Sequence, residues 1–220
     1  MTEKSIIILG DSFTFPDGNA ATNRVYTYAR GFNENGVKAN IVCFRNDYLV
    51  SHGGEVNGIT YYYPFRQTTR SPYFLIRRWH NILKYYNTLR IIKEIKRDHD
   101  IMAIIAYTVR MSTFLYAWFI SVILRTNLIL ERSEHPLKEI SSRIAIIGGY
   151  IKTFIEARLS DGILCISDYL RKFYRSVGAV ERKLLVVPST VDFTRFEGNF
   201  ITPFDFRYIC YCGSLTYTKD

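Results

Sequence analysis

Three neighbouring side chains with chemically useful groups follow one apolar segment of the chain. His135 and Glu134 could act as an acid/base pair, because imidazole and carboxylate groups both exchange protons in enzymes. Arg132 could contact a phosphate or carboxylate through its planar guanidinium. Alternatively, His135 is simply the residue that precedes Pro136 at the start of a helix. Glu131 could pair with Arg132 or with a lysine elsewhere. These residue types allow acid/base and anion-binding chemistry without requiring it.

Strands must hold these side chains in place. An open α/β sheet binds ligands at the carboxyl ends of its strands. The residues at or just after the carboxyl ends of the expected strands are 10–19, Arg45, Thr108, 131–136, Ser167 and 188–190. We therefore expect the chemistry at this edge of one sheet, and Ser167 is included among the candidate substrate-binding residues.

Short apolar segments alternate with helical patterns along the chain. The apolar segments predict strands at 6–9, 41–44, 59–63, 101–107, 127–131, 162–166 and 184–187. Helical spacing predicts a helix that ends at Gly36 and others at 72–97, 111–124, 137–160 and between Ser167 and Gly178. Residues 47–58 are expected to form a loop or a small hairpin. The alternation predicts an α/β fold with a doubly wound, parallel, Rossmann-like sheet.

Several motifs of other enzyme classes are absent. The sequence has no G-x-G-x-x-G fingerprint, no Walker A motif and no G-x-S-x-G elbow. Its cysteines form no C-x-x-C pair and stand apart from the histidines, at positions 43, 165, 210 and 212. We interpret them as buried free thiols in a reducing compartment, and we predict no metal site. The apolar run 114–124 is too short to span a bilayer and is typical of a buried helix.

The charge balance is strongly basic. The chain has 29 Lys+Arg against 20 Asp+Glu, a net charge of +9, which attracts phosphate in nucleic acid, an anionic membrane or a nucleotide alike. The expected helix 72–97 carries an apolar stripe of Leu75, Trp79, Ile82, Tyr86 and Leu89. Such a basic, aromatic-rich helix suits an anionic membrane, with Arg77, Arg78 and Lys84 as predicted membrane contacts. The alternative is a crossover helix with a solvated basic face.

One stretch, residues 161–196, carries a more specific pattern. It reads as strand, helix and strand, with Ile166-Ser167, Gly178, Val187-Pro188, Val191-Asp192 and Phe196 at fixed spacing. This order resembles the end of the N-terminal domain of family-4, GT-B-fold glycosyltransferases. The alternative is that any Rossmann-like domain can end in such a unit.

The resemblance implies a two-domain enzyme. Residues 1–203 would form the Rossmann-like, acceptor-side domain, and residues 204–220 a linker with the first strand and loop of a donor-binding domain. The parent enzyme would be a retaining hexosyltransferase that moves a sugar from a nucleotide-sugar donor to a saccharide or lipid-linked acceptor. The 220 residues alone would be inactive, since half a cleft cannot clamp a diphosphate. No cofactor besides the nucleotide-sugar co-substrate is expected.

The resemblance also assigns roles to residues. His135 or Glu134 would lie near the acceptor and the sugar, and Gly18 and Asn19 would lie at the mouth of the loop that faces the cleft between the domains. Gly213, Ser214 and Lys219 would contact the donor, although Ser214 stands where the family often has arginine. A stand-alone membrane-docking or binding module is the main alternative, and a nucleic-acid binder is disfavoured because no recognition motif is present. The expected location is cytoplasmic, with the inner face of the membrane as the surface for peripheral attachment.

Overall fold

The computed structural model describes residues 3–137, 142–190 and 204–209. Within them, eight strands form one sheet in the order β3-β4-β2-β1-β5-β6-β7-β8. Neighbouring strands are parallel except for the antiparallel pair β3 and β4. The strands are β1 Glu3–Gly10, β2 Lys38–Cys43, β3 Gly53–Val56, β4 Ile59–Tyr62, β5 His99–Tyr107, β6 Asn127–Arg132, β7 Gly162–Cys165 and β8 Leu184–Val186. The seven strands predicted between residues 6 and 187, the hairpin and the fold class are confirmed.

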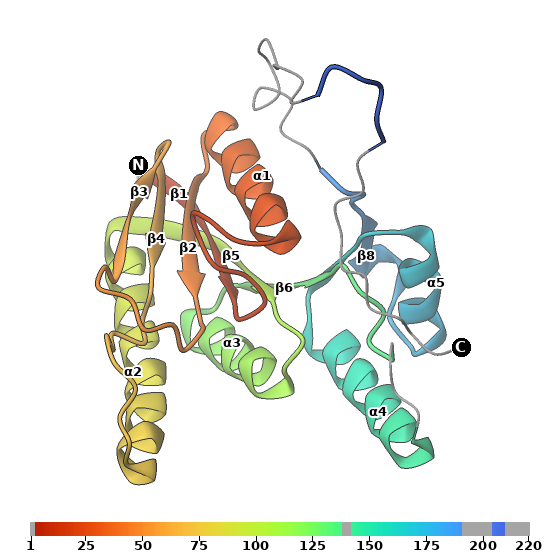
Figure 1. Cartoon of the computed structure of the whole chain (residues 1–220). Coiled ribbons are helices and arrows are strands. Elements are labelled where there is room, and N and C mark those ends of the chain that lie inside the picture. The colour runs from red at the N-terminus through yellow and green to blue at the C-terminus, as the bar shows by residue number, and fades with distance from the viewer. Residues whose placement is uncertain (1–2, 138–141, 191–203, 210–220) are drawn as a thin grey trace.

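Helices cover both faces of this sheet unequally (Figure 1). The helix α1 packs Val25 and Ala29 onto one face. On the other face one apolar core joins four helices to the sheet. The helices are α1 Ala20–Glu34, α2 Phe74–Asp98, α3 Met111–Leu124, α4 Arg143–Leu159 and α5 Asp168–Ser176. The described residues therefore form three layers, with the sheet in the middle.

Local sequence signals explain where the helices begin and end. The Asn19 side chain accepts hydrogen bonds from two backbone N–H groups at the start of α1, and Ser167 caps α5 in the same way. Gly36 and Gly178 follow α1 and α5 with positive φ angles of 73° and 98°. The predicted start of α4 at residue 137 is wrong. Leu137 lies in a turn, where its backbone N–H donates to Nδ1 of His135.

The chain runs outward from the centre of the sheet in two directions. From β1 it moves to β2 on one side, and from β5 it moves to β6, β7 and β8 on the other. The loops after β1 and β5 therefore diverge, which leaves a crevice at the carboxyl ends of these strands. Such a switch point is where open α/β sheets bind ligands.

The helix α2 differs from the prediction in which face it buries. Its stripe points to solvent except at Leu89, which packs against the core. Leu75 is 78% and Trp79 57% exposed, whereas the packed side carries Lys84, which is 5% exposed. The Lys84 ammonium donates to the Phe44 carbonyl and to Oδ1 of Asn46. Lys84 as a membrane contact is therefore wrong, because its charge points into the protein. Helix α3 is also less buried than predicted, since Leu115, Phe119, Val122 and Ile123 are exposed.

Burial of Lys84 predicts a pH dependence of stability. Burial lowers the pKa of Lys84 from 10.5 to about 8, so the folded state releases this proton more easily than the unfolded state. The free energy of unfolding should therefore rise with pH between about 8 and 10.5, by about 3 kcal/mol. Urea unfolding at several pH values would measure this rise against Lys84→Met, which cannot titrate there. Equal pH profiles for both proteins would contradict the prediction.

The remaining predictions about the chain concern its cysteine thiols, membrane-spanning helices and the expected second domain. Cys43 and Cys165 are free and buried, and burial raises the pKa of Cys43 to about 12 and that of Cys165 to about 11. None of the helices described is long and apolar enough to cross a membrane. Tyr208 and Ile209, where the strand 208–211 of the second domain was expected to begin, belong to no strand. Residues 210–220, with the rest of that predicted strand and the other two cysteines, lie outside the described residues.

Candidate functional site

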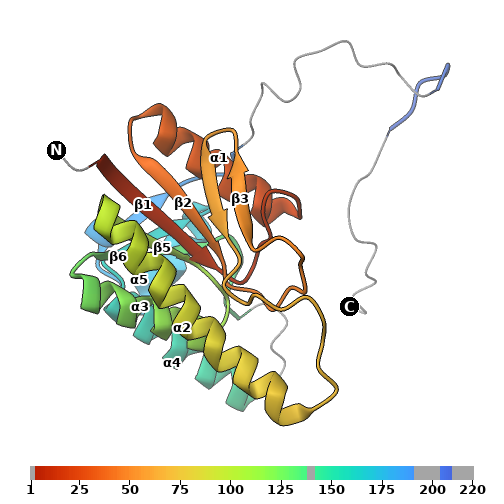
Figure 2. The same cartoon turned by 90° about the vertical axis from the view of Figure 1, so that its left-hand side faces the viewer.

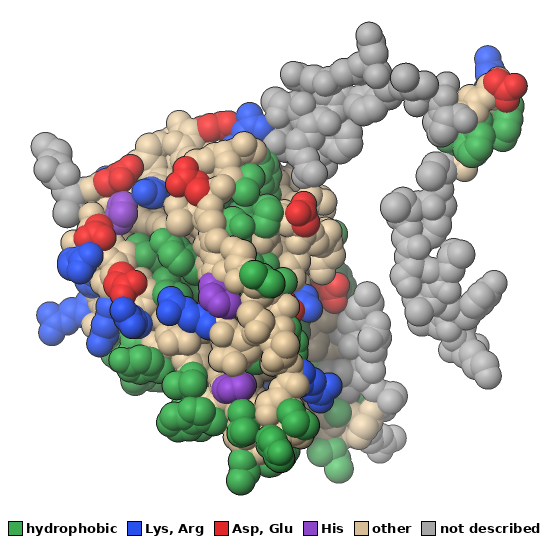
Figure 3. All heavy atoms as spheres, turned by 60° about the vertical axis from the view of Figure 1, so that its left-hand side comes forward, with side chains coloured by type: hydrophobic (Ala, Val, Ile, Leu, Met, Phe, Trp, Pro, Cys, Tyr) green, Lys and Arg blue, Asp and Glu red, His purple; other side chains and the backbone are tan. Residues whose placement is uncertain are grey.

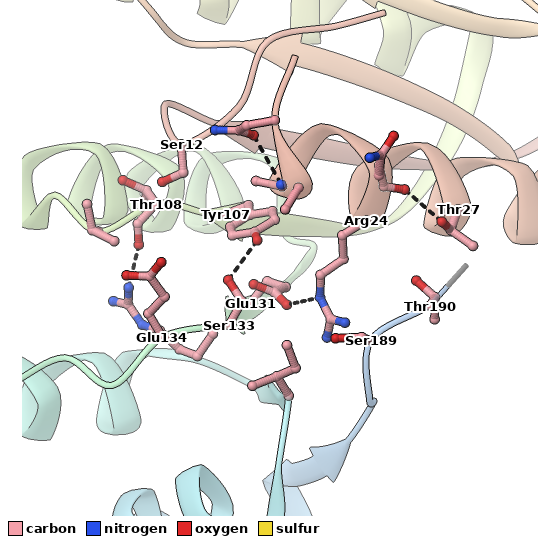
Figure 4. A pocket seen from close by; sticks show the side chains of 17 residues that line it. Ser12, Arg24, Thr27, Tyr107, Thr108, Glu131, Ser133, Glu134, Ser189 and Thr190 are labelled. Atoms are coloured by element: carbon pink, nitrogen blue, oxygen red, sulfur yellow. Dashed lines mark hydrogen bonds and ion pairs between the residues drawn. The ribbon is translucent and has the colours of Figure 1, made fainter. Parts of the chain in front are cut away.

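A pocket of about 620 Å³ lies at the carboxyl edge of the sheet, at the switch point between β1 and β5 (Figure 4). Its walls come from the loop after β1, the first turns of α1, the ends of β5 and β6 and the segment after β8. The residues that line it include Ser12, Asn19, Arg24, Thr27, Tyr107, Thr108, Glu131, Arg132, Ser133, Glu134, Ser189 and Thr190. Most of these side chains carry oxygen or nitrogen atoms, so the pocket suits a polar ligand.

The centre of the pocket wall is a buried ion pair. Nε of Arg24 donates to Oε1 of Glu131 at 2.6 Å, and both side chains are buried. The other guanidinium nitrogens of Arg24 each donate at 2.7 Å to the carbonyls of Pro188 and Val187. Arg24 thus joins α1, β6 and the segment after β8. Burial raises the pKa of Glu131, an effect that the adjacent Arg24 charge opposes.

Two hydroxyl oxygens in the pocket wall are buried and have no hydrogen-bond partner among the described residues, namely Oγ of Ser12 and Oγ1 of Thr190. The Glu131 carboxylate, which also lines the pocket, has the Tyr28 phenol as a nearby hydrogen-bond donor. An unpaired buried polar atom costs about 1–3 kcal/mol, so native proteins pair nearly all of them with protein, water or ligand. Two unpaired hydroxyls and a carboxylate in one pocket are a set of groups that hydrogen-bond ligand hydroxyls.

Tyr107 and Ser133 complete the wall between β5 and β6. The Tyr107 phenol oxygen lies 2.7 Å from Oγ of Ser133. Burial, and then the negative charge of Glu131, raise the pKa of Tyr107 to about 12. The phenol is therefore neutral at physiological pH and remains able to donate a hydrogen bond.

Arg132 lies at the pocket edge, but its guanidinium is used inside the protein. Nε donates to the Tyr174 hydroxyl at 2.9 Å, one Nη to the Thr108 carbonyl at 2.6 Å and the other to Glu156. Arg132 and Glu156 are both buried. The carboxylate that Arg132 contacts in the structure is therefore Glu156 of the protein itself, and not a ligand.

The structure separates the predicted acid/base pair. Glu134 is exposed and lines the pocket. The His135 ring lies outside the lining and packs on Phe173 of α5, with ring centroids 4.3 Å apart. Its Nδ1 accepts the Leu137 N–H at 3.2 Å. Of the two predicted residues, Glu134 is the one placed to reach a ligand in the pocket.

The other predicted binding residues have structural partners. Asn19 lines the pocket, while its side-chain oxygen caps α1. Gly18 packs so closely that a Cβ would lie 2.3 Å from Oγ1 of Thr22 and 2.4 Å from Oγ1 of Thr14. Ser167 caps α5 and is absent from the pocket lining. Gly213, Ser214 and Lys219 lie outside the described residues.

The pocket residues that the sequence did not single out come from four segments of the chain. Arg24 could have been found, because it lies one turn before Tyr28, on the border of the buried stripe of α1. Ser12 and Thr190 lie in the strand-end segments 10–19 and 188–190 that the sequence placed at this edge, but neither they nor Tyr107 carries a local signal that singles it out. In the described part of the chain, no three His, Cys, Asp or Glu side chains gather in a way that could hold a metal ion.

The fold and this pocket can be compared with known proteins. No protein-family model matches the chain, and no curated protein matches it. Among solved structures, it is similar to sucrose-phosphate synthase from Thermosynechococcus elongatus, with a TM-score of 0.56 and 9% identity over 84% of this chain and 48% of that one.

Two further structures show similar likeness. The lipopolysaccharide outer core galactosyltransferase WaaB in its apo form has a TM-score of 0.50 and 15% identity over 84% of this chain and 45% of its own. UDP-N-acetylglucosamine 2-epimerase from Rickettsia bellii has a TM-score of 0.51 and 12% identity over 86% and 45%. The chain thus spans about half the length of the structures it matches. Its described residues have the Rossmann-like fold of one half of a GT-B protein.

Proposed function

We propose that this chain is the acceptor-binding half of a nucleotide-sugar-dependent, retaining glycosyltransferase that acts on a saccharide or lipid-linked acceptor. The observation that carries the proposal is the pair of unpaired buried hydroxyls of Ser12 and Thr190 in the pocket at the switch point that Glu131 also lines. The fold, shared with halves of a sucrose-phosphate synthase and a galactosyltransferase, supports it.

The pocket offers what an acceptor sugar requires. Ser12 and Thr190 can donate or accept a hydrogen bond, and the Glu131 carboxylate can accept one from a sugar hydroxyl. A retaining transferase of this kind needs its acceptor hydroxyl positioned against the anomeric carbon and its leaving diphosphate neutralised, and needs no strong base. In this proposal Glu134 contacts the reacting sugar, while Gly213, Ser214 and Lys219 contact the donor. His135 supports the loop that carries Glu134.

Removing the two unpaired hydroxyls tests the acceptor site. The double variant Ser12→Ala/Thr190→Val should weaken saccharide binding by about tenfold, because two ligand hydrogen bonds are lost. Its stability should be unchanged, because neither hydroxyl has a partner among the described residues. Calorimetric titration with glucose, galactose, N-acetylglucosamine and their disaccharides would measure binding, and urea unfolding would measure stability.

Thr27→Val is the matched control. Thr27 lines the same pocket, but its hydroxyl already donates to the Asn23 carbonyl at 2.7 Å, so saccharide binding should be kept. If no saccharide binds, or if the double variant binds as well as the wild type, the proposed acceptor site is wrong.

Donor turnover is proposed for the two-domain enzyme, so the 220-residue chain should release no nucleotide. Conversion of a nucleotide sugar without an acceptor would favour an epimerase instead.

A further inference from the structure

The N-terminal half of α2 projects past the edge of the sheet (Figure 2). Only its later turns are packed on the core, through residues such as Thr88, Ile91 and Ile95. The projecting part exposes large apolar side chains, which we call the α2 surface: Tyr73, Phe74, Leu75, Ile76, Trp79 and Ile82. Hydrophobic side chains gather at the lower end of the molecule in Figure 3, with basic side chains beside them. A contiguous exposed apolar patch of this kind is typical of an interaction site.

A small basic pocket lies beside the α2 surface. It has a volume of about 300 Å³ and is lined by Arg70, Arg77, Arg78 and His80, among others. The Arg78 guanidinium lies 4.9 Å from the centre of the Phe74 ring, so apolar and basic groups are in contact. The first backbone N–H groups of α2 have no side-chain cap and add a partial positive charge. The pocket therefore suits a phosphate group.

No acidic residue balances this charge in the surrounding sequence. Between Glu55 and Glu94 the chain contains seven Lys and Arg residues and neither Asp nor Glu. One of the seven, Lys84, is buried, so the exposed charge comes from the arginines of the pocket, from Arg66 before them and from Arg90 and Lys93 after them. A surface that combines arginine, tryptophan and tyrosine with no carboxylate is complementary to an anionic, partly apolar partner.

We propose that the α2 surface docks on an anionic phospholipid bilayer, with a lipid phosphate held in the pocket of Arg70, Arg77 and Arg78. The aromatic and aliphatic side chains would lie at the boundary between headgroups and acyl chains. Because α2 follows the carboxyl end of β4, this surface lies towards the edge of the sheet that carries the candidate acceptor pocket. The inference concerns lipid binding alone and does not depend on the proposed sugar chemistry.

Vesicle flotation of the 220-residue chain tests the proposal. The protein should float with vesicles of phosphatidylcholine mixed with phosphatidylglycerol, stay behind with phosphatidylcholine alone, and be released by high salt. Arg70→Gln/Arg78→Gln should weaken binding about 30-fold, from the loss of two basic residues near the surface. Trp79→Ser should weaken it as well. Lys172→Gln/Arg182→Gln removes the same charge from exposed positions of α5 and the turn after it, and should bind like the wild type.

Several results would overturn the proposal. Equal flotation with neutral vesicles, no flotation at low salt, or equal losses in the matched control would each do so. Self-association that Trp79→Ser abolishes, without vesicle binding, would make the α2 surface an interface between copies. Protection of the arginine pocket by inorganic phosphate, again without vesicle binding, would make it a site for a soluble anion. Circular dichroism of each variant would confirm that α2 is intact.

Discussion

Replacing Arg132 with methionine is expected to lower the free energy of unfolding by about 3–5 kcal/mol, because it leaves Glu156 as a buried carboxylate without its main partner. The guanidinium donates to Glu156, to the Tyr174 hydroxyl and to the Thr108 carbonyl, so it joins β6 to α4, α5 and the end of β5. Only Lys152 remains near Glu156 among the described cations, at 3.8 Å. Urea unfolding would measure the loss.

Removing both charges distinguishes a structural role of the ion pair from a role of Arg132 in ligand binding. Arg132→Met/Glu156→Leu should recover part of the lost stability, since no buried charge is left unpaired, although the Tyr174 hydroxyl and the Thr108 carbonyl lose a donor. Arg110→Met is the control. Arg110 is exposed, and its nearest ion-pair contact, to Asp11, is long at 3.7 Å, so this substitution should change stability little. If Arg132→Met stays stable but loses ligand binding, Arg132 is the anion-binding residue that the sequence predicted.

The strands were predictable because their signals are local. The segments Ile6–Leu9 and Ile101–Tyr107 are continuous apolar runs, as expected of strands buried on both faces of a parallel sheet. Helix ends were also predictable where a single residue determines them, as Gly178 does after α5. The location of the site at the strand ends followed from these elements, since the switch-point rule needs only their order.

The orientation of α2 was not predictable in this way. Periodicity shows that Leu75, Trp79 and Ile82 share one side of the helix, but it does not show which side faces the sheet. The structure buries the side with Lys84, whose aliphatic stem packs while its ammonium lies 4.1 Å from the centre of the Phe44 ring. A helix that projects past its sheet can leave its apolar side in solvent, and sequence pattern alone does not reveal this.

The chemistry of the site depended on contacts between distant residues. Local spacing placed Arg132 with Glu134 and His135, whereas its partners Glu156 and Tyr174 lie 24 and 42 residues further along the chain. Arg24 and Glu131 are 107 residues apart. Such pairs form only when crossover connections bring helices and strands together, so residue types alone could not distinguish a ligand contact from a structural one.

Replacing Arg24 with methionine is expected to cost about 3–5 kcal/mol of stability at neutral pH, because Glu131 then remains as a buried carboxylate without its charged partner. The carbonyls of Val187 and Pro188 also lose their donors, which frees the segment that carries Thr190 into the pocket. Saccharide binding in the proposed acceptor pocket should therefore fall together with stability. Urea unfolding and calorimetric titration would measure the two losses.

The pH dependence of this loss identifies Glu131 as its cause. Burial raises the pKa of Glu131 above its ordinary value of 4.5, and Arg24 opposes that shift, so the variant raises the pKa further. The folded variant then binds this proton more tightly than the unfolded chain, and stability falls as pH rises above about 4.5. The deficit of Arg24→Met should be small below that pH, where Glu131 is protonated in both states, and full at neutral pH.

Arg30→Met, which breaks an exposed pair with Glu34 on the same helix, should cost less than about 1 kcal/mol at any pH. A deficit of Arg24→Met that does not change with pH would mean that the carbonyl contacts of Arg24, and not its charge, hold the pocket together.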